Sequence, residues 1–127
     1  PALYLRIVDH RVEPARFEEL KKTYQDVVAP VLLETPGCLA TYLVEGLRGK
    51  SQALSVTFWK DEASAVRYES GGQFDAFAAL LGPYLSGLYH WRLSLAPAGE
   101  ERALKGSDLS VSGFQIVAGR RLRAPGA

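Results

Sequence analysis

The run from Ser55 to Tyr84 constrains the fold most, because a strand pattern passes almost directly into a helix pattern. Residues 53–59 alternate apolar and polar side chains, the two-residue period of a β-strand. Asp61 is of the residue type that caps a helix, and a helix is expected over about 61–70. Gly71-Gly72 interrupts it, and a second helical piece is expected to end before Gly82-Pro83.

The remaining elements follow from the same periodicities. Residues 3–12 and 39–45 predict strands, with a polar hairpin over 46–51, and residues 88–95 predict a fourth strand. Apolar residues at three- and four-residue spacing predict a helix over about 14–34. Pro14 suits its first turn, whereas Pro30 should bend the helix late.

The order strand, helix, strand, strand, helix, strand predicts an α+β fold of the ferredoxin-like, split βαβ type. Its four-stranded antiparallel sheet carries two helices on one face. A chain of 127 residues is long enough for one core. We assign residues 1–97 to this domain and 98–127 to a C-terminal extension, with an extra strand over about 109–118 and a bulge at Gly113.

The predicted sheet has apolar residues on both faces, and one face includes Leu5, Ile7, Leu54 and Val56. An apolar face left in water would be an unusually large exposed patch. We therefore expect a homodimer formed through the sheet face. The strand at 109–118 is expected to pair with the partner's sheet.

Composition excludes several classes of function. A net charge of +1 is too small to predict a surface that binds nucleic acid. The basic cluster of Arg120, Arg121 and Arg123 is expected to be solvated. Cys38 is the only cysteine, so an internal disulfide is excluded and a cytoplasmic location is expected. No run of eighteen apolar residues is present, so no membrane association is expected.

Four short segments resemble the antibiotic biosynthesis monooxygenase (ABM) domains of the dimeric α/β-barrel superfamily. They are Val28-Ala-Pro30, Glu34-Thr-Pro-Gly-Cys-Leu39, Phe58-Trp-Lys-Asp-Glu-Ala63, and Phe74 with Phe77. The resemblance covers about residues 3–95. It implies a homodimer whose sheets close into a barrel, with a pocket between each sheet and its helices.

Members of that family include oxygenases that need no cofactor and act on aromatic phenols, and haem-degrading monooxygenases. The haem-degrading branch uses an Asn, a Trp and a His, where this sequence has His10, Tyr68 and Ala78. Ala78 cannot ligate iron, so the resemblance disfavours haem degradation. We therefore expect no cofactor.

Two histidines are candidates for acid–base chemistry. His10 and His90 can act as general bases near neutral pH, or each can be a strand-end histidine bonded to backbone or water. They fall on different strands without metal-ligand spacing, so no metal site is expected. Tyr68, which matches a family pocket position, is the third catalytic candidate, through a hydrogen bond to a substrate oxygen, or it is simply a partly exposed helix tyrosine.

The candidate substrate-binding residues are aromatic or basic: Trp59, Tyr42, Phe74, Phe77, Arg6 and Arg92. The aromatic residues can form a flat-sided cavity or simply be core. A buried, unpaired arginine is costly, so each of the two arginines is expected to pair with a carboxylate or an anionic ligand, or to reach water.

Two principal functions remain open at this stage. One is a cofactor-free monooxygenase that deprotonates a small phenol or quinol and presents the anion to oxygen. The other is a non-enzymatic dimeric barrel that binds a small apolar ligand. Haem binding through another histidine is a third.

Overall fold

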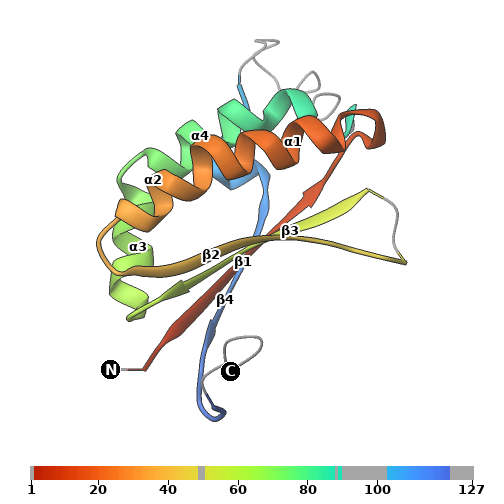
Figure 1. Cartoon of the computed structure of the whole chain (residues 1–127). Helices are drawn as coiled ribbons and strands as arrows, with labels where there is room; N and C mark the ends of the chain where they lie inside the picture. Colours follow the sequence, from red (N-terminus) through yellow and green to blue (C-terminus); the bar gives the residue numbers. More distant parts are fainter. Residues whose placement is uncertain (1, 49–50, 88, 90–102, 121–127) are drawn as a thin grey trace.

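The computed structural model describes residues 2–48, 51–87, 89 and 103–120. One four-stranded antiparallel sheet, in the order β2-β3-β1-β4, carries the helices on one of its faces (Figure 1). This is the predicted α+β, ferredoxin-like arrangement. None of the described helices is long and apolar enough to cross a membrane.

The strands lie where the two-residue period placed them. They are β1 (Tyr4–Arg11), β2 (Cys38–Glu45), β3 (Gln52–Trp59) and β4 (Ser110–Gln115). In the centre of the sheet β1 pairs with β3 through Arg6 opposite Thr57 and His10 opposite Ala53. Paired residues point to the same side of a sheet, so this register decides which side chains meet under the helices.

The first helical segment runs continuously over residues 14–34, as predicted, but it is not regular. It consists of η1 (Pro14–Arg16), α1 (Phe17–Thr23), the π-helical turn η2 (Tyr24–Val28) and α2 (Ala29–Glu34). Pro30 lacks the N–H that a regular helix would use. The irregularity predicted at Pro30 is the π-turn just before it, in which Ala29 N–H donates to the Tyr24 carbonyl.

The second helical segment has the predicted break. Asp61 caps α3 (Glu62–Ser70), because its Oδ1 accepts hydrogen bonds from Ser64 N–H at 2.8 Å and from Ser64 Oγ at 2.7 Å. Gly72 has φ +89° and separates α3 from α4 (Gln73–Leu81). The short η3 (Gly82–Tyr84) follows α4.

The fourth position in the sheet is filled differently from the prediction. The predicted strand at 88–95 lies outside the described residues except for Tyr89, which is buried in a helical turn. Instead β4, from the C-terminal extension, pairs with β1 of its own chain. Because β1 presents a free edge beside β3, this pairing satisfies its backbone without a second chain.

Gly113 is not a bulge, as the sequence had suggested. It pairs with Arg6 in a register that continues without a shift from Tyr4 to Asp9. A Cβ at Gly113 would overlap the Tyr4 phenol, so the glycine leaves room for a side chain on the neighbouring strand.

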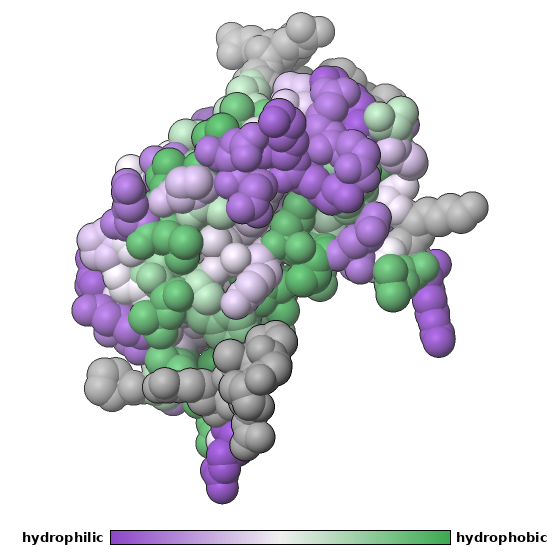
Figure 2. Space-filling view, viewed as in Figure 1, coloured by the Kyte–Doolittle hydropathy of each residue, from purple (hydrophilic) through white to green (hydrophobic). Residues whose placement is uncertain are grey.

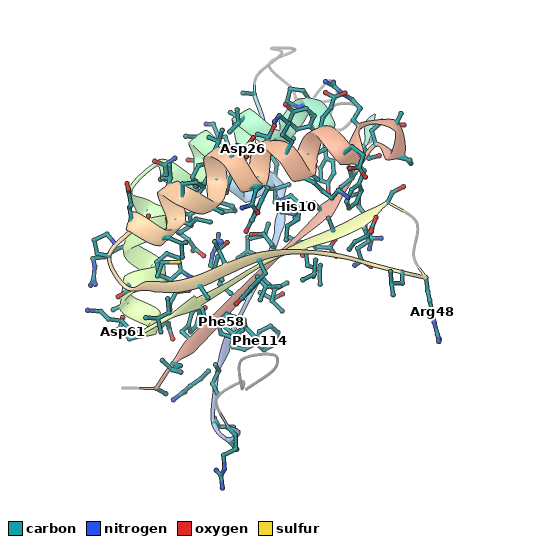
Figure 3. The ribbon with its side chains drawn as sticks, in the orientation of Figure 1. His10, Asp26, Arg48, Phe58, Asp61 and Phe114 are labelled. Atoms are coloured by element: carbon teal, nitrogen blue, oxygen red, sulfur yellow. The ribbon has the colours of Figure 1, made fainter. Side chains whose placement is uncertain are left out.

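The face of the sheet under the helices is unusually polar. The face under the helices carries Arg6, His10, Ser55 and Thr57, all buried. The opposite face carries the more apolar set, Leu5, Ile7, Leu54, Val56, Phe58 and Phe114. Phe58 and Phe114 point away from the helices (Figure 3). In Figure 2 the surface around α1 is largely hydrophilic, whereas hydrophobic residues gather along the strands below it.

The helical layer closes the helix-facing side with a continuous core. Leu20, Val28 and Leu32 from the first helical segment meet Phe77 and Leu81 from α4 over Val8. The polar residues of this face are thereby enclosed by apolar side chains, which is the arrangement that produces the site described next.

The break between α3 and α4 generates a stability prediction. Gly72→Ala should lower the free energy of unfolding by about 1 kcal/mol, because an alanine is strained at positive φ. No atom lies within 4 Å of a Cβ at Gly72, so a steric clash does not contribute.

Gly87→Ala is the matched control, because its Cβ also meets open space and its φ is not positive. Urea unfolding of both variants at one protein concentration measures the difference. Equal stability of the two variants would contradict the backbone explanation.

Candidate functional site

A small cavity lies between the polar face of the sheet and the helices, where Figure 3 places His10. Its volume is about 20 Å³, room for about one water molecule. Its walls come from β1, β3, the first helical segment, α3, α4 and the residue preceding β4. The lining residues are Arg6, Val8, His10, Tyr24, Val28, Leu32, Ser55, Thr57, Tyr68, Phe74, Phe77, Ala78, Leu81 and Leu109.

Arg6 is the only charged residue among those that line the cavity, and its side chain is 3% exposed. Its Nε donates to Glu69 Oε1 on α3, which forms an ion pair. The guanidinium carbon lies 4.1 Å from the centre of the Phe74 ring and 5.3 Å from that of Tyr68. Nη2 of Arg6 is buried without a hydrogen-bond partner.

His10 lies on the same face of β1 as Arg6, two side-chain repeats further along, and is 3% exposed. Its Nδ1 is also buried without a hydrogen-bond partner. Burial lowers the pKa of His10 to about 4, and the Ala53 backbone and the Asp9 carboxylate counteract this only partly. His10 is therefore neutral at pH 7, and it is a weaker base than an exposed histidine unless an anion lies beside it.

A hydroxyl cluster forms the opposite end of the polar wall. Tyr24 Oη, from the π-helical turn, lies 2.5 Å from Thr41 Oγ1 and 2.8 Å from Ser55 Oγ. Burial raises the pKa of the Tyr24 phenol above its ordinary value. The three hydroxyls satisfy one another, so this end of the cavity is polar but uncharged.

The aromatic wall is built around Tyr68 on α3. The centre of its ring lies 5.2 Å from Trp59, 6.1 Å from Phe74 and 6.5 Å from Phe77. Burial raises the pKa of the Tyr68 phenol, so the hydroxyl keeps its proton at neutral pH. Tyr68 is thus suited to donate a hydrogen bond and not to act as a base.

An open groove adjoins the cavity on the side of α4 and β4. It has a volume of about 460 Å³, and its walls include Glu69, Asp75, Lys105 and Val111. Phe74 and Leu109 border both the groove and the cavity. The chain packs tightly here, because Gly106 N–H donates to Asp75 Oδ1 at 2.7 Å and a Cβ at Gly106 would overlap the Phe74 ring.

A cavity between a ferredoxin-like sheet and its helices agrees with a family match. The model of the family described as "Antibiotic biosynthesis monooxygenase" matches residues 4–80, which contain all of the cavity's lining except Leu81 and Leu109. The chain belongs to this family. The ABM match spans β1 to α4 and leaves β4 outside it. No curated protein matches the chain significantly.

Solved structures share the ABM chain's fold at low identity. A monooxygenase from the gene ActVA-Orf6 of Streptomyces coelicolor, in complex with nanaomycin D, has a TM-score of 0.64 at 17% identity, covering 97% of this chain and 94% of that one. A candidate ABM protein from Bordetella bronchiseptica has a TM-score of 0.66 at 15% identity, covering 93% and 100%. One from Caulobacter crescentus CB15 has a TM-score of 0.64 at 18% identity, covering 92% of each chain.

The structure brings together five of the residues predicted for the site. Arg6, His10, Tyr68, Phe74 and Phe77 line the ABM chain's cavity. Ala78 lines it too, with a methyl group that offers no ligand to a metal. Among the described residues no group of three or more His, Cys, Asp or Glu side chains is placed to hold a metal ion.

The other predicted site residues lie elsewhere. Trp59 is fully buried behind the cavity wall, where it packs on Tyr68 and donates from Nε1 to Thr57 Oγ1 at 2.8 Å. Tyr42 is 55% exposed on the opposite face of the sheet, edge-on to Phe58 at 6.4 Å, so it does not line the cavity of its own chain. His90 and Arg92 lie outside the described residues.

Sequence reasoning missed Tyr24, Ser55, Thr57, Glu69 and Leu109. The alternation along β3 placed Ser55 and Thr57 on the face opposite Leu54 and Val56, but they were not considered as site residues. The sequence of β1 did indicate a polar site on this face, because Arg6 and His10 are an even number of residues apart and so point to the same side of the strand. Tyr24 was read only as part of an apolar helix stripe.

The buried His10 generates a pH prediction. Its pKa of about 4 in the folded protein is lower than the ordinary value of 6.5. Between these values the unfolded chain binds more protons, so stability should fall as the pH drops from about 6.5 to about 4, by about 3 kcal/mol from His10 alone. Above about pH 6.5 its contribution is constant.

His10→Gln should remove this component while other titrating groups continue to contribute. Urea unfolding of both proteins from pH 7.5 to 4 measures it, and NMR titration of the imidazole carbon, assigned by its loss in the variant, gives the pKa. A His10 pKa near 6.5 in the folded protein would contradict the burial argument.

Proposed function

We propose that this ABM protein is a cofactor-independent monooxygenase that acts on a small aromatic phenol or quinol, which binds where the cavity between sheet and helices meets the adjoining groove. The observation that supports the proposal is the pairing of two walls around one space. The aromatic wall of Tyr68, Phe74 and Phe77 suits a flat ring, and the polar wall of Arg6 and His10 suits an oxygen that loses its proton.

The proposed chemistry needs little from the protein beyond deprotonation and positioning. An anthrone, through its phenol tautomer, loses a proton to give an electron-rich anion, which reduces oxygen. Overall the methylene group becomes a carbonyl: one O₂ supplies the carbonyl oxygen, and its second oxygen atom leaves as water. The substrate therefore supplies all four electrons.

His10 is the proposed base and Tyr68 the proposed hydrogen-bond donor. Neutral His10 can accept the substrate proton, and the anion that results then favours the imidazolium by charge. Tyr68 retains its own proton and can donate to the substrate oxygen. The apolar lining of Val28, Leu32 and Phe77 excludes water from the reactive anion.

We also propose that the protein forms a homodimer through the face of the sheet that lies opposite the helices. That face carries Ile7, Val56, Phe58 and Phe114, and no helix of the described residues covers it. Tyr42 and Val44, which are 55% and 40% exposed, extend it along β2. A second copy presents the same apolar face, so a two-fold arrangement of sheets covers both at once.

Oxygen uptake with a panel of anthrones and quinols tests the proposed reaction. Turnover should require an acidic hydroxyl on the ring, and His10→Gln should lower kcat by about 100-fold or more. Tyr68→Phe should also lower kcat, because one hydrogen bond to the anion is lost.

Tyr84→Phe is the matched control for Tyr68→Phe, because Tyr84 lies outside the cavity and contacts Thr23 Oγ1 at 3.1 Å. It should leave kcat unchanged. Binding of the aromatic compounds without any oxygen uptake would sink the oxygenase proposal and leave the ligand-binding barrel in its place.

Val56→Arg tests the proposed dimer. An arginine in the middle of the apolar face would be buried there without a partner, so the protein should become monomeric. Val66→Arg on α3 is the control, because Val66 is a 51% exposed helix residue. Light scattering after gel filtration gives the masses. A monomeric parent protein, or a Val56→Arg dimer, would disprove this interface.

A further inference from the structure

The Arg6 guanidinium has more donors than it has partners. A guanidinium offers five N–H donors, and here Nε bonds Glu69 whereas Nη2 is buried without an acceptor. Buried polar groups in proteins nearly always have a partner. An unsatisfied cationic donor among the lining residues of a cavity therefore marks a position where an acceptor is expected.

The surroundings of Arg6 specify the kind of acceptor. The ring centre of Phe74 lies 4.1 Å from the guanidinium carbon, so the cation is flanked by an aromatic face. A charged donor binds an anionic oxygen more strongly than a neutral one. His10 Nδ1, also unpartnered on this wall, provides a second polar contact.

Glu69 already supplies Arg6 with a carboxylate, but it is not enclosed as Arg6 is. Its side chain is 39% exposed, and it lines the groove on the outer side of Phe74. The carboxylate can therefore turn towards water at small cost when another anion reaches the guanidinium. Glu69 is suited to be the counter-ion of Arg6 until a ligand anion replaces it.

The Phe74 side chain lies where a ligand would pass from the groove into the cavity. The cavity of about 20 Å³ is too small for an aromatic ring, whereas the adjoining groove of about 460 Å³ is large enough. Phe74 and Leu109 border both spaces, so rotation of the Phe74 ring would join them. A ring from the groove can then take the place of the Phe74 ring beside Arg6.

We propose that Arg6 is the specificity-determining residue of this site and selects a flat aromatic ligand that carries an anionic oxygen. The ligand's oxyanion bonds Nη2 and displaces the Glu69 carboxylate, while its ring displaces that of Phe74. This deepens the proposed function, on which it rests for the location of the site, by naming the charge that the substrate carries when bound.

Calorimetric titration with 2-naphthoate and 2-naphthamide tests the proposal, because the two probes have the same ring and differ in charge. The protein should prefer the anion. Arg6→Met should weaken 2-naphthoate binding by roughly 10- to 100-fold and leave 2-naphthamide within about twofold. Glu69→Gln should strengthen 2-naphthoate binding by roughly 3- to 10-fold, because the competing anion is removed.

Arg16→Met is the matched control. Arg16 also pairs with a glutamate, at 2.8 Å to Glu19, and stacks on an aromatic ring, at 5.0 Å from Tyr84, but it is outside the cavity. It should leave both affinities unchanged. Arg6→Lys keeps the charge and should recover part of the 2-naphthoate affinity if Arg6→Met is poorly folded.

The opposite effects of Arg6→Met and Glu69→Gln separate recognition from a structural role, since loss of a purely structural ion pair would weaken binding in both variants. Equal affinity for the two probes, weaker 2-naphthoate binding by Glu69→Gln, or no 2-naphthoate binding up to its solubility limit would overturn the proposal. Preference for the anion without oxygen uptake would overturn only the oxygenase function. Oxygen uptake with no change in KM on Arg6→Met would overturn only the role of Arg6.

Discussion

The burial of Arg6 on the central strand of the sheet is the constraint on which the rest of the structure depends. An arginine under a helical layer needs a counter-ion and polar neighbours, because desolvation of an unpaired charge is expensive. Glu69 supplies the counter-ion from α3, and the aromatic faces of Phe74 and Tyr68 flank the guanidinium. The helix-facing side of β1 and β3 therefore combines polar residues with Val8, Ala53 and Trp59, and the larger apolar set faces outwards.

Several irregular features of the chain are consistent with this arrangement. The π-helical turn places Tyr24 where its hydroxyl meets Ser55 and Thr41, so these polar groups are satisfied without water. The Gly72 break sets α4 at an angle to α3, with Phe74 just after the break. At the far edge Gly106 leaves space for the Phe74 ring, and β4 completes the sheet beside β1. The side of the site near Gly106 is therefore closed by the packing of the Phe74 ring.

Local patterns in the sequence predicted much of the fold, and long-range placement was the part that they did not contain. The period of two on β3, the Asp61 cap and the Gly71-Gly72 break each act within a few residues, and each was found where expected. Which side of the sheet faces the helices depends on packing across the whole domain. The expected homodimer placed the face with Leu5, Ile7, Leu54 and Val56 away from the helices, but Ser55 and Thr57 on the other face were overlooked as site residues. The residues 109–118 formed a recognisable strand, but its pairing with its own β1 depends on which sheet edge is free.

The central claim is that the polar face of the sheet, enclosed by the helices, is where a ligand binds. A crystal structure of the protein with 2-naphthoate tests it most directly. The account predicts the carboxylate at Arg6 Nη2, the ring in the place of the Phe74 side chain, and Glu69 turned towards the groove. A 2-naphthoate molecule bound on the outer face near Val56 and Phe58, with the Arg6–Glu69 pair unchanged, would contradict it.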